Sequence, residues 1–209
     1  MLIDLKFLIY KYNVEIKGIL HIGAHLCEEK ILYNENNVSD NRIIWIEANP
    51  ILVNKIKSMN NKIKIECFCC IDDDIGYSTL NIANNGMSSS ILKLGIHKKF
   101  YPNIDYIGNI QVNNKRIDTF YKENNISVDF ANFLCIDIQG TELLALKGMG
   151  DLLKYFDYLY LEVNQDYLYE KCALIGEIDN YLNTFSFKRV ETKWENDCKW
   201  GDAFYIKNF

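Results

Sequence analysis

The sequence lacks the features that would place it in a membrane or on a nucleic acid. No apolar run in its 209 residues approaches the roughly 18 that a helix needs to span a bilayer. No cluster of Lys and Arg is present and the formal net charge is −5, so no electrostatic footprint for a phosphate backbone is visible. Residues 1–16 carry Asp4 and Lys6 in an apolar stretch without a small-residue cleavage site, which favours an N-terminal helix over a signal peptide. We expect neither a nucleic-acid nor a membrane partner.

The cysteine pattern fits neither a disulfide framework nor a zinc finger. Seven cysteines is an odd number, and without a secretory signal we expect reduced thiols in a cytoplasm. Cys67 and Cys70 form a C-x-x-C, but no second pair follows at zinc-finger spacing, so buried apolar thiols are the expected reading. Frequent Asn, Ile, Lys and Tyr indicate an A/T-rich genome, of a low-GC bacterium or a large DNA virus. In the viral case the compartment is the host cytoplasm.

Strand and helix patterns alternate through the first third of the chain. Residues 18–22, 43–46 and 64–68 are short apolar runs that predict buried strands. Helical apolar stripes lie between them, at residues 26–33 and after Pro50. The order strand, helix, strand, helix, strand predicts an α/β fold with a largely parallel sheet.

The rest of the chain continues this pattern after a different middle. We expect one domain over residues 1–209, in which residues 77–116 form an insertion that supplies a lid or the acceptor side. Residues 91–107 are mixed and aromatic and allow no firm assignment. The expected elements are strands at 77–82, 109–112, 133–136 and 158–163, helices at 118–124, 142–147 and 174–182, and a terminal strand pair at 187–191 and 203–206.

Three turns at predicted strand ends carry candidate binding groups. In open α/β sheets ligands bind at the carboxyl ends of the strands. Gly23 follows the first strand in a turn that lets backbone approach a ligand closely. Glu47 ends the second strand, where a carboxylate can accept both hydroxyls of a ribose. Asp137 ends a later strand, just before a glycine turn and an amphipathic helix.

These turns resemble the signature of the FkbM family of S-adenosylmethionine-dependent methyltransferases. The segment Ile136-Asp137-Ile138-Gln139-Gly140-Thr141-Glu142, which continues to Gly148, is similar to the family's "KIDVEGAE…VLKGA". Residues 46–50, Ile-Glu-Ala-Asn-Pro, are similar to "FEPNP". The turn at residues 21–25 resembles "D-V-G-A-N/H-x-G", with His21 at the position of the acid and Cys27 at that of the second glycine. The resemblance covers roughly residues 17–192.

The resemblance implies a class I methyltransferase fold and a set of site residues. The fold has a seven-stranded sheet with its last strand antiparallel and helices on both faces. The cofactor is S-adenosylmethionine. Implied cofactor contacts are His21, Gly23, Ala24 and His25 at the methionine end, Glu47 with Ala48 and Asn49 at the ribose, Ile71 and Asp72 at the adenine, Ser89 in a loop over the site, and Asp137. The surface turn at residues 72–76 and the serine loop at 87–90 are equally compatible with a purely structural role.

The expected reaction is methyl transfer to a hydroxyl oxygen of a sugar, glycan or small metabolite. The protein must position that hydroxyl and remove its proton. Asp137 is the first candidate base, followed by Glu162 and His25. Glu142 opens a helix, where the dipole favours a carboxylate anyway, and His97 is interpreted as a surface histidine. Oxygens of Asp137 and Glu162 suit Mg²⁺, but no dense acidic cluster supports a metal, and none is expected.

Two other classes of protein compete with this interpretation. A nicotinamide-dependent oxidoreductase would use the same turn and ribose acid, but it calls for a G-x-G-x-x-G that residues 23–28 lack. Tyr155 does not form a Tyr-x-x-x-Lys pair, since Leu159 stands four residues after it. A methyltransferase-like fold kept as a non-catalytic binding module stays open because of His21 and Cys27. The acceptor's identity and the oligomeric state are beyond the sequence.

Overall fold

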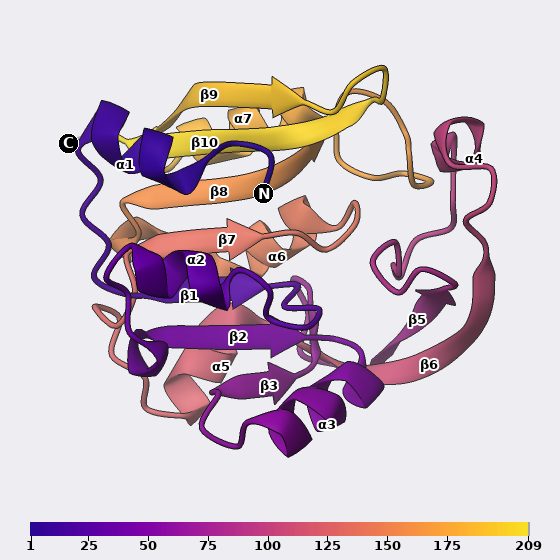
Figure 1. Cartoon of the computed structure of the whole chain (residues 1–209), viewed down its shortest axis with the longest axis horizontal. Helices are drawn as coiled ribbons and strands as arrows, with labels where there is room; N and C mark the ends of the chain where they lie inside the picture. Colours follow the sequence, from indigo (N-terminus) through magenta and orange to yellow (C-terminus); the bar gives the residue numbers. More distant parts are fainter. Residues whose placement is uncertain (209) are drawn as a thin grey trace.

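A seven-stranded sheet forms the centre of the molecule in the computed structural model, which describes residues 1–208 (Figure 1). The sheet is mostly parallel: neighbouring strands from β3 to β8 run the same way, and β10 is antiparallel to both β8 and β9. This arrangement confirms the predicted fold. In spatial order the strands are β3 (Ile65–Cys67), β2 (Ile43–Glu47), β1 (Ile19–Ile22), β7 (Phe133–Ile136), β8 (Tyr158–Asn164), β10 (Trp200–Lys207) and β9 (Phe187–Trp194).

Helices cover both faces of the sheet, as predicted, and an apolar core lies under each set. Successive residues of β1 serve opposite cores, with Ile19 in one and Leu20 in the other. The central strands are thus buried on both faces, which is why they read as unbroken apolar runs. One face carries α1 (Leu5–Tyr12), α2 (Lys30–Glu35) and α3 (Pro50–Met59), and the other carries α5 (Ile117–Glu123), α6 (Glu142–Met149) and α7 (Ile175–Asn183) (Figure 1).

Local chemistry fixes where several helices begin. The Asp4 side chain caps α1 by accepting a hydrogen bond from the amide of Phe7 at 2.8 Å. Asn49 caps α3 in the same way, accepting from the amide of Ile51 at 3.0 Å, and Pro50 occupies the first turn. Two 3-10 helices, η1 (Asp40–Arg42) and η2 (Gly150–Tyr155), complete the connections around β2 and α6.

Two predicted helices are shorter in the structure. The N-terminal helix, expected to extend to residue 16, ends at Tyr12 because Asn13 adopts a left-handed conformation. The helix expected from residue 26 begins only at Lys30. The cause is a turn in which His25 and Cys27 have φ angles of +44° and +58°, conformations that a right-handed helix cannot include. Cys27 therefore occupies a backbone position that favours the glycine found there in the family's turn.

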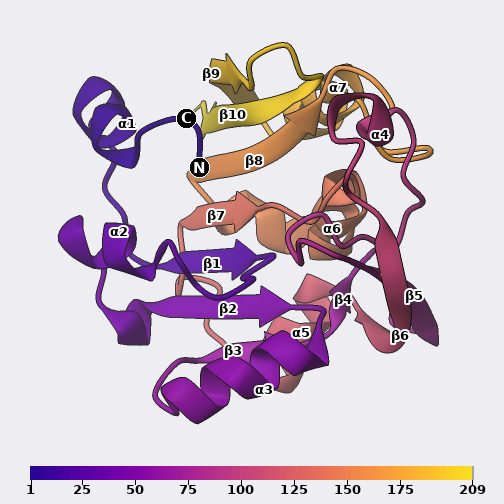
Figure 2. The ribbon, with the colours of Figure 1, turned by 45° about the vertical axis from the view of Figure 1, so that its right-hand side comes forward.

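A small three-stranded sheet stands beyond the carboxyl ends of the parallel strands (Figure 2). Its order is β4 (Cys69–Cys70), β6 (Tyr106–Lys115) and β5 (Tyr77–Ala83). The sequence predicted β5 and the middle of β6 but missed β4, whose two residues are too few to show a period. The unassigned segment 91–107 contains the short helix α4 (His97–Phe100). Helix α4 and the antiparallel pair β5 and β6 thus lie over the edge where ligands bind in α/β folds (Figure 1).

Two further observations concern the thiols and membranes. All seven cysteines are free thiols in the structure. Across residues 1–208, no helix combines the length and the apolar character that crossing a membrane requires.

Candidate functional site

A cavity of about 510 Å³ opens at the carboxyl edge of the main sheet, within the size range of ligand pockets. Its lining follows the order of the strands. At one end, the strand-end half, it is lined by the turn after β1, the end of β2 and the segment after β3 that includes β4, namely Gly23, His25, Glu47, Ala48, Asn49, Phe68, Cys69 and Cys70. At the other end, the aromatic half, it is lined by His97, Tyr101, Leu168, Tyr169 and Trp200. Asp137, Gln139 and Glu162, at the ends of β7 and β8, lie between the two halves.

The turn after β1 admits only glycine at position 23. Gly23 has a φ angle of +92°, and a Cβ placed there would lie 1.8 Å from the carbonyl oxygen of Asp137. The amides of Gly23 and Ala24 donate to the carbonyl oxygen of Ile46 at 2.8 and 3.0 Å. These contacts hold the ends of β1, β2 and β7 together and bring bare backbone to the cavity wall.

Glu47 is oriented by two backbone amides. Its carboxylate accepts from His25 at 2.8 Å and from Asn49 at 2.7 Å. Burial raises the pKa of this carboxyl, although both hydrogen bonds act in the opposite direction. The acid predicted at the end of the second strand therefore lines the cavity in a defined orientation.

His21 cannot supply the negative charge of a carboxylate. Its ring is buried against Trp45, with ring centroids 4.6 Å apart, and Nδ1 lies 2.8 Å from the hydroxyl of Tyr33. Burial lowers the pKa of His21 to about 4, so the imidazole is neutral at pH 7. Sequence reasoning missed two carboxylates that line the cavity in the same turn, Glu28 and Glu29. Glu28 lies 2.6 Å from Nδ1 of His25, and burial raises the pKa of Glu29.

Gln139 joins the two carboxylates at the centre of the cavity. Its amide nitrogen donates to Oδ1 of Asp137 at 2.6 Å and to Oε2 of Glu162 at 2.7 Å. The hydroxyl of Tyr169 donates to the amide oxygen of Gln139, and Ser90 Oγ donates to its carbonyl at 2.8 Å. Burial, and then the charge of Asp137, raise the pKa of Glu162 well above its usual value. Glu162 therefore holds a proton more tightly than an isolated carboxyl does, and it lines the cavity beside Asp137.

Glu142 supports the turn that carries Asp137 and Gln139. It is fully buried, and Oε1 accepts from the amides of Ile138 at 3.1 Å and Gly140 at 3.0 Å. Its Oε2 has no hydrogen-bond partner among the described residues. Burial raises the pKa of Glu142 to about 7. The position of Glu142 at the start of α6 was predicted, but its hydrogen bonds with backbone amides of the preceding turn were not.

The aromatic half consists of side chains brought together from distant segments. The His97 ring lies 4.9 Å from that of Tyr101 and 5.4 Å from that of Tyr169, measured between centroids. Trp200 Nε1 donates to the hydroxyl of Tyr101 at 2.9 Å. His97 is only 4% exposed, so its interpretation as a surface histidine was wrong. The amide of His97 donates to the carbonyl of Leu168, and this contact packs α4 against the loop after β8. No sequence period marks that contact.

Most predicted site residues line this one cavity, and three do not. Ala24 is buried in the turn, and Ile71 and Asp72 lie outside the lining. Asp72 is exposed, and its carbonyl accepts from Arg116 at 3.0 Å. The pairing of β4 with β6 carries the chain away from the sheet edge at this point, so the adenine assignment of Ile71 and Asp72 lacks geometric support. The predicted residues that line the cavity are His21, Gly23, His25, Glu47, Ala48, Asn49, Ser89, Asp137 and Glu162.

Metal ligands do not gather in the part of the chain that the structure describes. Within residues 1–208 no three His, Cys, Asp or Glu side chains form a group that could hold a metal ion. The absence of a metal stays a prediction.

Comparison with known proteins gives a family and a fold. The model of the methyltransferase FkbM domain matches residues 21–189 of the chain. A search of curated proteins finds no match. Among solved structures, an FkbM methyltransferase from Methylobacillus flagellatus KT is similar at 17% identity and a TM-score of 0.53, over 90% of this chain and 43% of that one. The chain thus spans less than half of that protein's length, and the likeness shows the fold.

Other methyltransferase structures match more weakly. A SAM-dependent methyltransferase from Aquifex aeolicus is 12% identical with a TM-score of 0.49, and the match covers 98% of this chain and 90% of that one. The magnesium protoporphyrin IX methyltransferase from Synechocystis PCC 6803, solved with bound SAM, is 8% identical with a TM-score of 0.49, over 97% and 76% of the two chains.

Proposed function

Since the chain belongs to the FkbM family of methyltransferases, whose cofactor is S-adenosylmethionine, we propose that it methylates a hydroxyl oxygen of a sugar, glycan or small metabolite. The observation that carries this proposal is the Asp137–Gln139–Glu162 group at the centre of the cavity. A hydroxyl loses its proton when it attacks a methyl group, and a carboxylate at that place can accept it.

The strand-end half suits the cofactor. The bare backbone at Gly23 allows close approach of the methionine end, and a carboxylate such as Glu47 matches a ribose diol. Phe68, Cys69 and Cys70 offer an apolar place for the adenine, which we assign to them instead of Ile71 and Asp72. The carboxylates of Glu28 and Glu29 suit the ammonium of the methionine end, where His21 carries no charge.

The chain's own residues supply positioning and a proton acceptor. S-adenosylmethionine brings a methyl group already activated by a sulfonium. The acceptor oxygen forms the new bond to the methyl carbon, and the bond to sulfur breaks with its electron pair staying on sulfur. Asp137 is our first candidate to receive the hydroxyl proton, with Glu162 and His25 as alternatives. Gln139 orients the first two by donating to both. This alignment is what an in-line displacement requires.

In this proposal, residues 77–116 form the side of the cavity that binds the acceptor. Its serine loop and α4 contribute Ser88, Ser89, Ser90 and His97 to the cavity wall. The one-domain organisation and a lid role for the segment are part of the same proposal. Free thiols on all seven cysteines support a reducing compartment such as a cytoplasm.

Calorimetric titration of S-adenosylmethionine and of NAD, side by side, tests the cofactor half of the proposal. We expect binding of the first and none of the second. Transfer of a deuterated methyl group to a panel of hydroxylated compounds, read by mass spectrometry, tests the reaction. Cofactor binding without transfer to any oxygen, nitrogen or carbon acceptor would favour a non-catalytic binding module.

A further inference from the structure

The backbone of Gln139 is fixed by the turn that carries it. It has a φ angle of +54°, and its carbonyl accepts a hydrogen bond from Ser90 Oγ at 2.8 Å. The neighbouring amides of Ile138 and Gly140 donate to the buried carboxylate of Glu142 at 3.1 and 3.0 Å. With the backbone held on both sides, the side-chain amide has one choice left, namely which of its two ends faces the centre of the cavity.

The two ends of that amide have different partners. Nε2 donates to Asp137 at 2.6 Å and to Glu162 at 2.7 Å, which uses both of its hydrogens. Oε1 accepts from the hydroxyl of Tyr169. Because the two ends of the planar amide lie opposite each other, Nε2 faces both carboxyl groups only while Oε1 faces Tyr169.

The carboxyl groups alone do not fix this orientation. Burial and the charge of Asp137 raise the pKa of Glu162 well above its usual value, so Glu162 can carry a proton and donate it to Oε1 of a reversed amide. Tyr169 opposes that reversal. Its hydroxyl would exchange the bond to Gln139 for a contact with the carbonyl of Ser88 at 3.5 Å, which is long for a hydrogen bond. Burial raises the pKa of Tyr169, so the hydroxyl keeps its proton and stays a donor.

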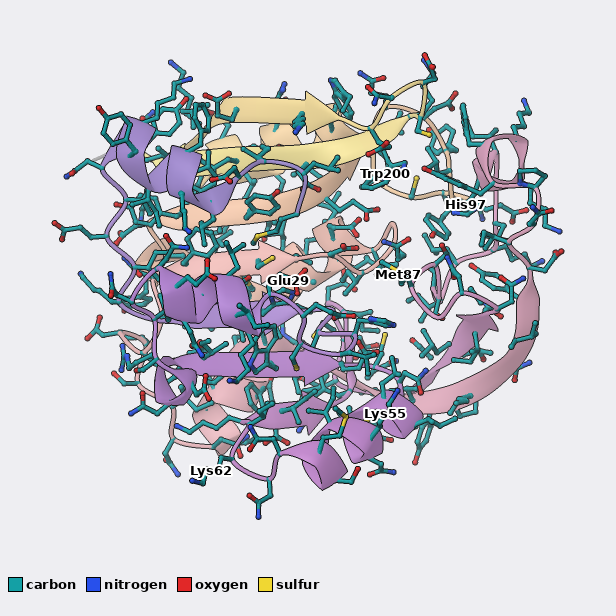
Figure 3. All side chains as sticks on the ribbon, viewed as in Figure 1. Glu29, Lys55, Lys62, Met87, His97 and Trp200 are labelled. Carbon is teal, nitrogen blue, oxygen red and sulfur yellow. The ribbon has the colours of Figure 1, made fainter. Side chains whose placement is uncertain are left out.

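Tyr169 is itself held by two connections that lie far apart in the sequence. It is buried, and a Cβ added at Gly140 would lie 3.2 Å from its own Cβ, so the loop after β8 packs closely on the turn that carries Gln139. The same loop pairs with the segment before α4, where the amide of Gly95 donates to the carbonyl of Leu168 at 2.7 Å. His97 of α4, labelled in Figure 3, packs its ring on Tyr169 with centroids 5.4 Å apart. The packing of these two connections therefore sets where the Tyr169 hydroxyl stands.

We propose that Tyr169 is a positioning residue for methyl transfer, whose hydroxyl fixes the amide of Gln139 so that Asp137 and Glu162 keep the arrangement that accepts the hydroxyl proton. This inference rests on the proposed methyltransferase function. It makes the rate of transfer depend on how α4 and the loop after β8 pack together. The motif "KIDVEGAE" has Glu at the position of Gln139. An ionised carboxylate there could not donate to two other carboxyl groups, so this arrangement sets the chain apart from the motif.

The side-chain resonances of Gln139 test the positioning without any acceptor. The chain has three glutamines, Gln111, Gln139 and Gln165, so selective ¹⁵N labelling gives a simple spectrum of side-chain amides. Gln139→Leu identifies the signals that belong to Gln139. We expect both of its amide protons to resonate downfield of those of an exposed amide, because each is hydrogen-bonded to a carboxyl group. In Tyr169→Phe they should move toward the values of an exposed amide, and signals that do not move overturn the proposal.

Transfer rates test the consequence for the reaction. They are measured in single turnovers, with saturating deuterated-methyl S-adenosylmethionine and the hydroxylated compound of the panel that reacts fastest. We expect Tyr169→Phe to lower the rate by about two- to tenfold, the effect of one neutral hydrogen bond. The dissociation constant for S-adenosylmethionine and the melting temperature should change little. The control is Tyr167→Phe, which removes an exposed hydroxyl from the same loop. An unchanged rate in Tyr169→Phe, or an equal loss in the control, overturns the proposal.

Combining the two substitutions shows whether Tyr169 acts through Gln139. Gln139→Leu alone should lower the rate by about tenfold or more, because both carboxyl groups lose a hydrogen bond. Adding Tyr169→Phe to it should then change the rate by less than about twofold. Losses that add would show that Tyr169 acts on the acceptor or on packing alone, and they overturn the positioning role. If no compound of the panel is methylated, the proposed function fails, and the amide resonances by themselves decide whether Tyr169 positions Gln139.

Discussion

The two halves of the cavity are built in different ways. The strand-end half comes from turns that follow β1, β2 and β3, and its contacts are mainly between side chains and nearby backbone, as between Glu47 and the amides of His25 and Asn49. The aromatic half comes from three segments far apart in the sequence, and its contacts join side chains such as Trp200 and Tyr101. The first half is therefore encoded locally, and the second depends on the whole fold.

This difference predicts that the strand-end half binds the cofactor and that the aromatic half sets the specificity of this chain. Backbone geometry at strand ends suits the family's cofactor, because such a site depends on few side chains. Side chains carried by long connections change without cost to the sheet. The following variants separate the halves, starting with the carboxylates between them.

Asp137→Asn should have the largest effect. If Asp137 takes the acceptor's proton, transfer should fall by about 10² to 10⁴, the usual contribution of general acid–base catalysis. Asparagine is close to aspartate in size. In one orientation of its amide, its side-chain oxygen can still accept the hydrogen bond from Gln139. The fold and most of the cofactor affinity should therefore remain. Single-turnover rates at saturating cofactor measure this. A rate within about threefold of the unaltered protein would remove Asp137 from the proton-transfer role.

A rival role for Asp137 makes a distinct prediction. If it only anchors the cofactor or the turn at residues 137–140, its loss should lower cofactor affinity or thermal stability, with turnover near normal at saturation. Glu162→Gln is the matched comparison, because both carboxylates accept from the same amide of Gln139. The larger rate loss identifies the group that takes the proton.

The sequence predicted the strand-end half better than the aromatic half for a physical reason. Gly23, Glu47 and Asp137 each follow an apolar run, and the parallel fold brings all such ends to one edge. His97 and Tyr169 meet only because α4 packs on the loop after β8. No period of two or 3.6 residues encodes that contact.

The adenine assignment lacks geometric support where the chain leaves its strand. The adenine residues were assigned as if the chain continued along the cavity edge after β3. Instead β4 pairs with β6, and Cys69 and Cys70 line the cavity while Asp72 faces solvent. The pairing joins residues more than forty positions apart, such as Cys69 and Asn114, and local patterns carry no information about such partners.

Glu47→Ala should weaken the strand-end half alone. Loss of a charged hydrogen-bonding group costs about 1.5–3 kcal/mol, which corresponds to roughly 10- to 100-fold weaker binding of S-adenosylmethionine. Calorimetry measures the change. Glu66→Ala is the control, since Glu66 is exposed on the neighbouring strand β3 and does not line the cavity. Unchanged affinity in Glu47→Ala would refute the ribose assignment.

Glu142→Gln should change the pH dependence of stability rather than either half of the cavity. Burial raises the pKa of Glu142 from 4.5 to about 7, so the folded protein binds this proton more tightly than the unfolded chain does. Its contribution to stability is fully present below the unfolded value and is lost as pH rises through about 7. Gln keeps an oxygen for the amides of Ile138 and Gly140 and carries no charge at any pH.

Urea denaturation at two pH values tests this expectation. The Gln variant should be more stable than the unaltered protein by about 1–3 kcal/mol at pH 8 and nearly equal to it at pH 4. A stability difference that does not vary with pH would show that Glu142 does not carry the shifted proton. Cofactor affinity measured at pH 6, where the carboxyl is mostly protonated, serves as the control for an intact turn.

Trp200→Phe should have the smallest effect, confined to the aromatic half. The indole Nε1 donates to the hydroxyl of Tyr101 at 2.9 Å, and a neutral hydrogen bond of this kind contributes about 0.5–1.5 kcal/mol. The hydroxyl of Tyr101 keeps a contact with Cys198 Sγ at 3.2 Å, so the ring stays in place with more freedom. We expect the acceptor's KM to rise by about two- to tenfold, while the cofactor's dissociation constant is unchanged.

A double-mutant cycle separates this hydrogen bond from the rest of the wall. Tyr101→Phe removes the same bond from the other side, so once either change is made the second should cost little more. Losses in acceptor KM that simply add would show that the two side chains act independently on the acceptor. A matching loss of cofactor affinity in either variant would show that the two halves are not separate. In either case, the hydrogen bond between Trp200 and Tyr101 would not explain how segments far apart in the sequence form one binding surface for the acceptor.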